Sequence, residues 1–171
     1  MEEKAIVIFF QGNKKIEAIR KKYDPFYKEV KTHLTLVYPF NNINPKKLKK
    51  HIISSLSTKK SFKVVLNGFQ NSSKDYYLYL LVKKGKSKII NLYHKLNSGV
   101  LRGFENKDMK KFIPHVTLGI FKDKKDISRA RKELRNIKIA TDFTIDKISL
   151  LTFKKGRKIK ARKDFKLDKK I

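Results

Sequence analysis

A short pattern that occurs twice constrains this chain more than any other feature. Residues 32–36 read Thr-His-Leu-Thr-Leu and residues 114–118 read Pro-His-Val-Thr-Leu, each inside an apolar run that predicts a β-strand. Because side chains alternate between the faces of a strand, His33 and Thr35 share one face, and so do His115 and Thr117. The aliphatic residues point the other way. This is the layout of an active site built on a rigid sheet.

Chance is a poor explanation for the repetition. With four His and seven Thr among 171 residues, about 0.16 His-x-Thr matches are expected. The chain has two, and Leu follows both. Either copy alone is also compatible with a half-buried strand, in which the His is merely hydrogen-bonded and the Thr is an ordinary β-branched residue. The pair together favours a catalytic role.

The paired motifs resemble those of the 2H phosphoesterase superfamily, which includes the bacterial 2′-5′ RNA ligase-like (LigT-like) proteins and the cyclic nucleotide phosphodiesterases. Residues 20–27 before the first motif, and residues 99–101 and 112–119 around the second, are similar to its small bacterial YjcG-like branch. The resemblance covers nearly the whole chain. One departure is the run 119–122, Gly-Ile-Phe-Lys, where many RNA-ligase-like members have an Arg.

The resemblance implies a metal-independent phosphodiesterase that acts on 2′,3′-cyclic phosphates or 2′-5′ linkages of RNA ends or small nucleotides. We predict His33 and His115 as the general acid and base, since imidazole has an unperturbed pKa near ~6.5 and can fill either role at neutral pH. Thr35 and Thr117 are predicted to bind the substrate phosphate. The positive charge around the pair should lower the pKa of both His residues.

Two alternatives stay open beside this function. The first is an RNA-binding module that keeps the scaffold without turnover, although a pure binder has no need for a matched acid and base. The second is a hydrolase of a non-nucleotide cyclic phosphate, which the missing Arg leaves open.

Composition bears on partners and cofactors. A net charge of +29, from 44 Lys and Arg against 15 Asp and Glu, predicts attraction to nucleic acid. Only seven of the basic residues are Arg, the better bidentate phosphate ligand, so a solvated Lys surface is the alternative. No cofactor or metal is expected, because the chain has no Cys and no HExxH pattern. His51 and His94, with no Thr two residues on, are predicted to be surface or boundary residues.

No apolar run is long enough to span a bilayer, and the first twelve residues lack the pattern of a signal peptide. We therefore expect a cytoplasmic protein with no membrane partner. We also expect a monomer.

The hydrophobic pattern predicts the order βαβαββαβαββ. Strands are expected at 4–10, 32–39, 62–69, 76–82, 113–121, 143–153 and 158–167, the last two joined by a turn at 154–157. Helices are expected at 14–23, from Pro45 onward, at 87–97 and after residue 126. The second helix should bury Leu48, Ile52, Ile53 and Leu56, and the fourth should bury Ala130, Leu134 and Ile137.

These elements predict an α+β fold of two pseudo-symmetric lobes, each an antiparallel sheet with helices on its outer face, around a central cleft. Residues 1–171 form a single domain whose repeated halves are approximately 1–84 and 85–171, with one motif in each.

Two further segments have two interpretations each. Tyr23, Asp24 and Tyr27 either line the cleft or stack a base, or they belong to a turn plugged by aromatic side chains. Lys158, Lys160 and Arg162 share one face of the last strand. They either flank a nucleic-acid groove or guard a solvated edge strand.

Overall fold

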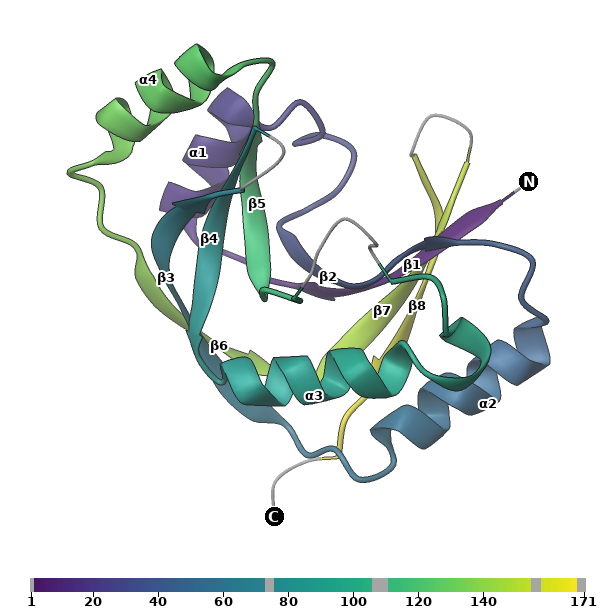
Figure 1. The fold of residues 1–171 in the computed structure, drawn as a ribbon. Helices are drawn as coiled ribbons and strands as arrows, with labels where there is room; N and C mark the ends of the chain where they lie inside the picture. Colours follow the sequence, from purple (N-terminus) through teal and green to yellow (C-terminus); the bar gives the residue numbers. More distant parts are fainter. Residues whose placement is uncertain (1, 73–75, 106–110, 155–157, 169–171) are drawn as a thin grey trace.

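The computed structural model describes residues 2–72, 76–105, 111–154 and 158–168, so most of the turn expected at 154–157 lies outside it. Within the described residues the chain forms two four-stranded sheets and four α-helices (Figure 1). None of the described helices is long and apolar enough to cross a membrane.

Both sheets are antiparallel throughout. The first has the order β2-β1-β7-β8 and the second the order β5-β4-β3-β6. The strands of the first sheet are β1 (Glu3–Phe9), β2 (His33–Phe40), β7 (Lys147–Phe153) and β8 (Ile159–Lys166). Those of the second are β3 (Phe62–Asn71), β4 (Tyr77–Lys84), β5 (His115–Ile120) and β6 (Ala140–Ile145). The predicted α+β fold with two lobes is confirmed.

The helices are α1 (Lys14–Tyr23), α2 (Pro45–Leu56), α3 (Lys86–Leu96) and α4 (Lys124–Leu134), with a 3₁₀ turn η1 (Gly99–Leu101) after α3. Three of them begin at a side-chain cap. The carboxamide oxygens of Asn13 and Asn44 and a carboxylate oxygen of Asp123 accept backbone N–H groups of the first turn. Pro45 then occupies the first helical position, where the absent N–H costs nothing.

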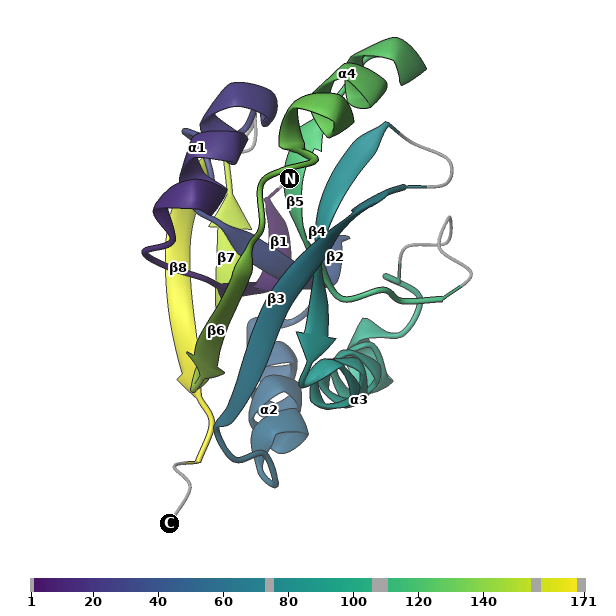
Figure 2. The ribbon, with the colours of Figure 1, turned by 90° about the vertical axis from the view of Figure 1, so that its left-hand side faces the viewer.

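The two lobes share one core. α2 and α3 contact each other and lie against strands of the first sheet, whereas α1, which follows β1, packs against β5 of the second sheet (Figures 1 and 2). α1 and α4 are joined by an ion pair between Lys22 and Glu133 at 2.5 Å. A single cluster of buried apolar side chains runs through both lobes. Neither lobe therefore has a core of its own.

The two motif strands meet at what we call the β2–β5 seam. β2 is an edge strand of the first sheet and β5 an edge strand of the second, and the two strands contact each other (Figure 1). The segments that begin at His33 and at His115, far apart in sequence, are therefore brought together in space.

The prediction of one continuous strand at 143–153 is wrong. This segment belongs to two strands, β6 and β7, which are separated at Asp146 and lie in different sheets. Apolar alternation does not reveal which sheet a strand joins. As a result, each sheet takes two strands from residues 1–84 and two from residues 85–171. The division into repeated halves stays a prediction.

Three smaller predictions are also corrected. Ile53 is 51% exposed rather than buried, because one residue after Ile52 a helix has turned by about 100°. α4 ends before Ile137, which is 37% exposed. Besides Ala130 and Leu134, the helix buries Ile127. β2 continues through Pro39, since an edge strand tolerates a residue that has no N–H.

Candidate active site at the seam between the sheets

Both motif strands show the predicted alternation of burial. Their polar members are half-buried and their aliphatic members are fully buried. The half-buried residues are His33, Thr35, His115 and Thr117, and the buried ones are Leu34, Leu36, Val116 and Leu118. Each strand therefore keeps an imidazole and a hydroxyl on the face turned away from the core.

On the first sheet, an aromatic ring of the neighbouring strand lies beside His33. The register of β1 and β2 sets Phe9 opposite His33 and Val7 opposite Thr35. The rings of Phe9 and His33 meet edge to face, with centroids 6.3 Å apart. Phe9 therefore restricts the His33 ring on its β1 side.

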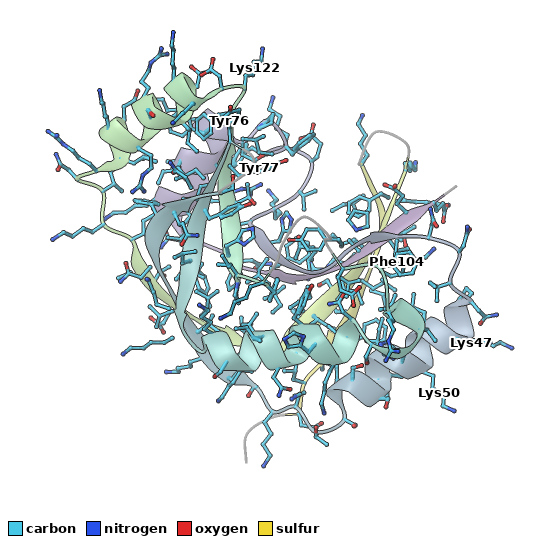
Figure 3. The ribbon with its side chains drawn as sticks, in the orientation of Figure 1. Lys47, Lys50, Tyr76, Tyr77, Phe104 and Lys122 are labelled. Carbon is cyan, nitrogen blue, oxygen red and sulfur yellow. The ribbon has the colours of Figure 1, made fainter. Side chains whose placement is uncertain are left out.

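On the second sheet, Tyr79 of β4 lies against His115. The register sets Tyr79 opposite Thr117, one place along the same face. The ring centroids of Tyr79 and His115 are 3.7 Å apart and the planes differ by 28°, which is a stacked arrangement. Tyr77 follows at 6.2 Å from Tyr79 on the same face of β4 (Figure 3). The sequence does not mark these aromatic residues as neighbours of the second motif, because the pairing of β4 with β5 cannot be read from either strand alone.

The two His rings are anchored in the same way. Nδ1 of His33 lies 2.8 Å from the carbonyl oxygen of Lys31, and Nδ1 of His115 lies 2.6 Å from that of Ile113. Because a carbonyl can only accept, Nδ1 is the donor in both bonds. In each neutral ring Nε2 then carries the lone pair. Nε2 is thus a proton acceptor when the ring is neutral and a donor when it is charged.

Burial lowers the pKa of both rings. It is the main cause that brings the pKa of His115 to about 4, and the positive charge of His33 acts in the same direction. The pKa of His33 is lowered by burial and also by the charge of Arg20. The direction agrees with the prediction, but the main cause is burial rather than the Lys-rich surface. The influence of His33 on His115 is consistent with the contact between β2 and β5.

A buried ion pair holds the segment that leads into His33. Arg20, only 2% exposed, bonds Asp24 at 3.0 and 2.6 Å, the hydroxyl of Thr32 at 3.1 Å and the carbonyl of Val30 at 2.8 Å. The Thr32 hydroxyl in turn donates to Glu17. Residues 24–32 are therefore tied to α1, and Thr32 is a structural residue rather than part of the site.

The contacts of residues 23–27 support the packed-turn interpretation. Asp24 is buried in the ion pair, and the ring of Tyr23 packs against Phe121 with centroids 5.5 Å apart. The Tyr23 hydroxyl bonds Glu133 of α4. The side chains of Tyr23 and Asp24 therefore join elements together.

The comparisons with known proteins bear on the same two motifs. A family model of the 2′-5′ RNA ligase superfamily matches residues 10–157, a range that holds both. The chain belongs to the 2′-5′ RNA ligase superfamily.

Three solved structures share the fold of this superfamily member. E. coli LigT complexed with ATP is 17% identical, with 98% of each chain covered and a TM-score of 0.61. The protein TT0787 of Thermus thermophilus is 16% identical over 99% of this chain and 100% of that chain, with a TM-score of 0.64. Usb1 of Kluyveromyces marxianus is 12% identical over 96% and 98%, with a TM-score of 0.57.

At such identities these structures show the fold alone. No curated protein matches the chain. The superfamily is confirmed, while the YjcG-like branch stays a prediction.

The other two His residues lie away from the seam. The ring of His51 on α2 bonds the carbonyl oxygen of Leu96 on α3 at 2.9 Å through Nε2, and His94 is exposed on α3. Among the described residues, no group of three or more His, Asp or Glu side chains is placed to hold a metal ion.

A cavity of about 520 Å³ lies between residues 58–62 and the start of α3, and no motif residue lines it. We do not assign this cavity as the catalytic site, because neither of the His–Thr pairs lines it. We therefore place the candidate active site at the β2–β5 seam on the chemistry of its residues.

Proposed function

We propose that the chain is a metal-independent phosphodiesterase that opens 2′,3′-cyclic phosphates or cleaves 2′-5′ linkages of RNA ends or small nucleotides. The observation that carries the proposal is the matched pair at the seam. His33 and His115 each donate through Nδ1 to a carbonyl two residues earlier, and each has a Thr two residues later on the same face. Membership of the superfamily and the net charge of +29 support an RNA-related substrate.

The reaction needs two proton transfers on opposite sides of phosphorus. One neutral ring takes a proton from the attacking water at Nε2 as the water oxygen bonds phosphorus. The other ring, protonated, gives its Nε2 proton to the ribose oxygen as the bond from phosphorus to that oxygen breaks. Rings carried by strands of two different sheets suit this in-line geometry. The hydroxyls of Thr35 and Thr117 donate to the non-bridging oxygens.

Because both pKa values are lowered, the substrate itself is needed to protonate the ring that acts as the acid. Above the pKa of about 4 of His115, that ring is neutral in the free protein, and the pKa of His33 is also lowered. A bound phosphate anion favours the charged form of a nearby imidazole. Substrate binding therefore protonates the ring that acts as the acid, while the other ring stays neutral and acts as the base.

Ligands seen in solved structures of E. coli LigT are consistent with this substrate class. The crystallised complexes contain ATP, 3′-AMP or phosphate. We propose that the seam of this chain likewise accepts a nucleotide phosphate.

The test is turnover of a panel of cyclic mononucleotides, 2′-5′ dinucleotides and RNA with a cyclic phosphate end. His33→Ala and His115→Ala should each abolish turnover, and His94→Ala, on the exposed face of α3, should leave it unchanged. Turnover should survive EDTA, and its bell-shaped pH profile should have an optimum below the ordinary pKa of free imidazole. The two apparent pKa values belong to the coupled pair.

Full activity in either motif His variant contradicts the proposal. So does a rate that EDTA eliminates and Mn²⁺ or Zn²⁺ restores. RNA binding without turnover of any substrate would favour the binding-module alternative. Turnover confined to cyclic phosphates without a nucleoside would favour the non-nucleotide hydrolase.

A further inference from the structure

The last strand of the first sheet brings an Arg to the neighbourhood of His33. The Cζ atom of Arg162 on β8 lies 4.4 Å from the centre of the Phe9 ring, and that ring lies 6.3 Å from the ring of His33. Together these distances place the guanidinium within about 11 Å of the His33 ring, in contact with an aromatic face as cation–π pairs are. By contrast, Lys122, a basic residue shortly after the second motif, projects outward beyond the far end of β5 (Figure 3).

The strand registers put Arg162 on the same face of the sheet as the first motif. Thr35 is opposite Val7, Val7 is opposite Ser149, and Ser149 is opposite Asp164. Directly paired residues of neighbouring strands share a face, and residues two apart on one strand do also. Arg162 is two residues before Asp164. It therefore lies on the face that carries His33 and Thr35.

Arg162 is exposed, but hydrogen bonds hold its guanidinium in position. Its Nε lies 2.7 Å from one carboxylate oxygen of Asp164, and one of its terminal nitrogens lies 3.0 Å from the other. The hydroxyl of Ser149 donates to the same carboxylate at 2.7 Å. The hydrogen bond from Arg162 is the largest cause that lowers the pKa of Asp164, so this carboxylate stays ionised. The arrangement fixes the guanidinium plane, and its other terminal nitrogen lies outside the bidentate pair.

The surroundings suit an anionic strand. Residues 158–166 contain five basic residues and one acidic residue, and β8 is the exposed edge of its sheet (Figure 2). A cavity of about 270 Å³ next to Arg162 is lined by Phe9, Gln11, Thr144 and Lys147, with Asp146 as an acidic member. Side chains with amide, hydroxyl, ammonium and guanidinium groups therefore line a cavity that Phe9 and Arg162 share.

We propose that Arg162 binds a phosphate of a single-stranded RNA adjacent to the phosphate that reacts at His33 and His115, so that β8 guides the strand and the substrate is an oligonucleotide rather than a mononucleotide. The inference rests on the proposed function, since it extends from the same site. It favours the groove-flanking interpretation of the last strand. A cyclic mononucleotide has no second phosphate and cannot use this contact.

The experiment compares Arg162→Gln with wild type on short single-stranded RNA ending in a 2′,3′-cyclic phosphate and on 2′,3′-cyclic AMP. The ratio of kcat/KM for RNA to that for the mononucleotide should fall by about 10- to 100-fold, the effect of one hydrogen bond to a charged group. The salt dependence of RNA binding should also weaken by about one unit of slope. Arg129→Gln is the matched control, because its guanidinium is exposed and has an Asp126 partner at 3.8 Å. It should change neither quantity.

An unchanged ratio in Arg162→Gln, or an equal loss on both substrates, overturns the inference. If the wild-type protein turns over no member of the panel, the proposed function fails instead. Binding of end-labelled RNA at several salt concentrations then still tests Arg162. Equal slopes for wild type and Arg162→Gln would overturn its role, whereas a smaller slope in the variant would support it.

Discussion

His115→Gln tests whether burial holds this ring neutral in the folded protein. The pKa of His115 is lowered from 6.5 to about 4 in the fold, whereas the unfolded chain has the ordinary value near ~6.5. As the pH falls, the unfolded chain therefore binds the proton first. His115 destabilises the wild-type fold progressively as the pH falls from about 6.5 to about 4 and has no such effect at higher pH. The Gln variant lacks this contribution.

The size of the effect follows from the shift. Each pKa unit corresponds to about 1.4 kcal/mol, so the full shift is worth about 3 kcal/mol below pH ~4 and about 2 kcal/mol near pH ~5. Because the ring is half-buried by its accessible surface rather than sealed off, about 3 kcal/mol is an upper limit.

The assay is urea unfolding of both proteins between neutral pH and about pH 5. The free energy of unfolding of His115→Gln should improve relative to wild type by about 2 kcal/mol over this range. Thr117→Val, on the same strand, removes no titrating group and should run parallel to wild type. Parallel curves for His115→Gln and wild type would refute the argument that burial depresses this pKa.

Five further substitutions test the site, the ion pair beside it and the packing of α2. Thr35→Ala and Thr117→Ala should each lower kcat/KM by about 10- to 100-fold, as expected for a lost hydrogen bond to a charged oxygen; unaffected kinetics would remove either Thr from the site. Arg20→Met should cost about 3–5 kcal/mol in urea unfolding, because it leaves the carboxylate of Asp24 buried and unpaired. A loss below about 1 kcal/mol would mean that water replaces the ion pair. Ile52→Ala should cost about 2–5 kcal/mol, whereas Ile53→Ala should stay within about 0.5 kcal/mol, because only the first is buried. Equal costs would contradict the orientation of α2.

Features that depend on neighbours along the chain could be predicted. The alternation of His33 and Thr35 with Leu34 and Leu36 follows from the two-residue period of a strand, and the burial pattern agrees with it. The start of α2 after Asn44 follows from a cap and a Pro that act within one turn. The predicted buried face of α2 nevertheless included Ile53, which is exposed. Hydrophobicity alone does not show how wide the buried face of a helix is.

The chain by itself thus determined which residues share a face, and it predicted the chemistry that we propose for the two His–Thr pairs. Only the tertiary structure decided which strands are neighbours. That choice puts Tyr79 against His115, and Phe9 and then Arg162 beside His33, and it sends the two strands that meet at Asp146 into different sheets. The physical reason is that strand pairing joins residues far apart in sequence through backbone groups that every residue carries. Side-chain periodicity therefore specifies the faces of each strand, and packing of the shared core selects its partners.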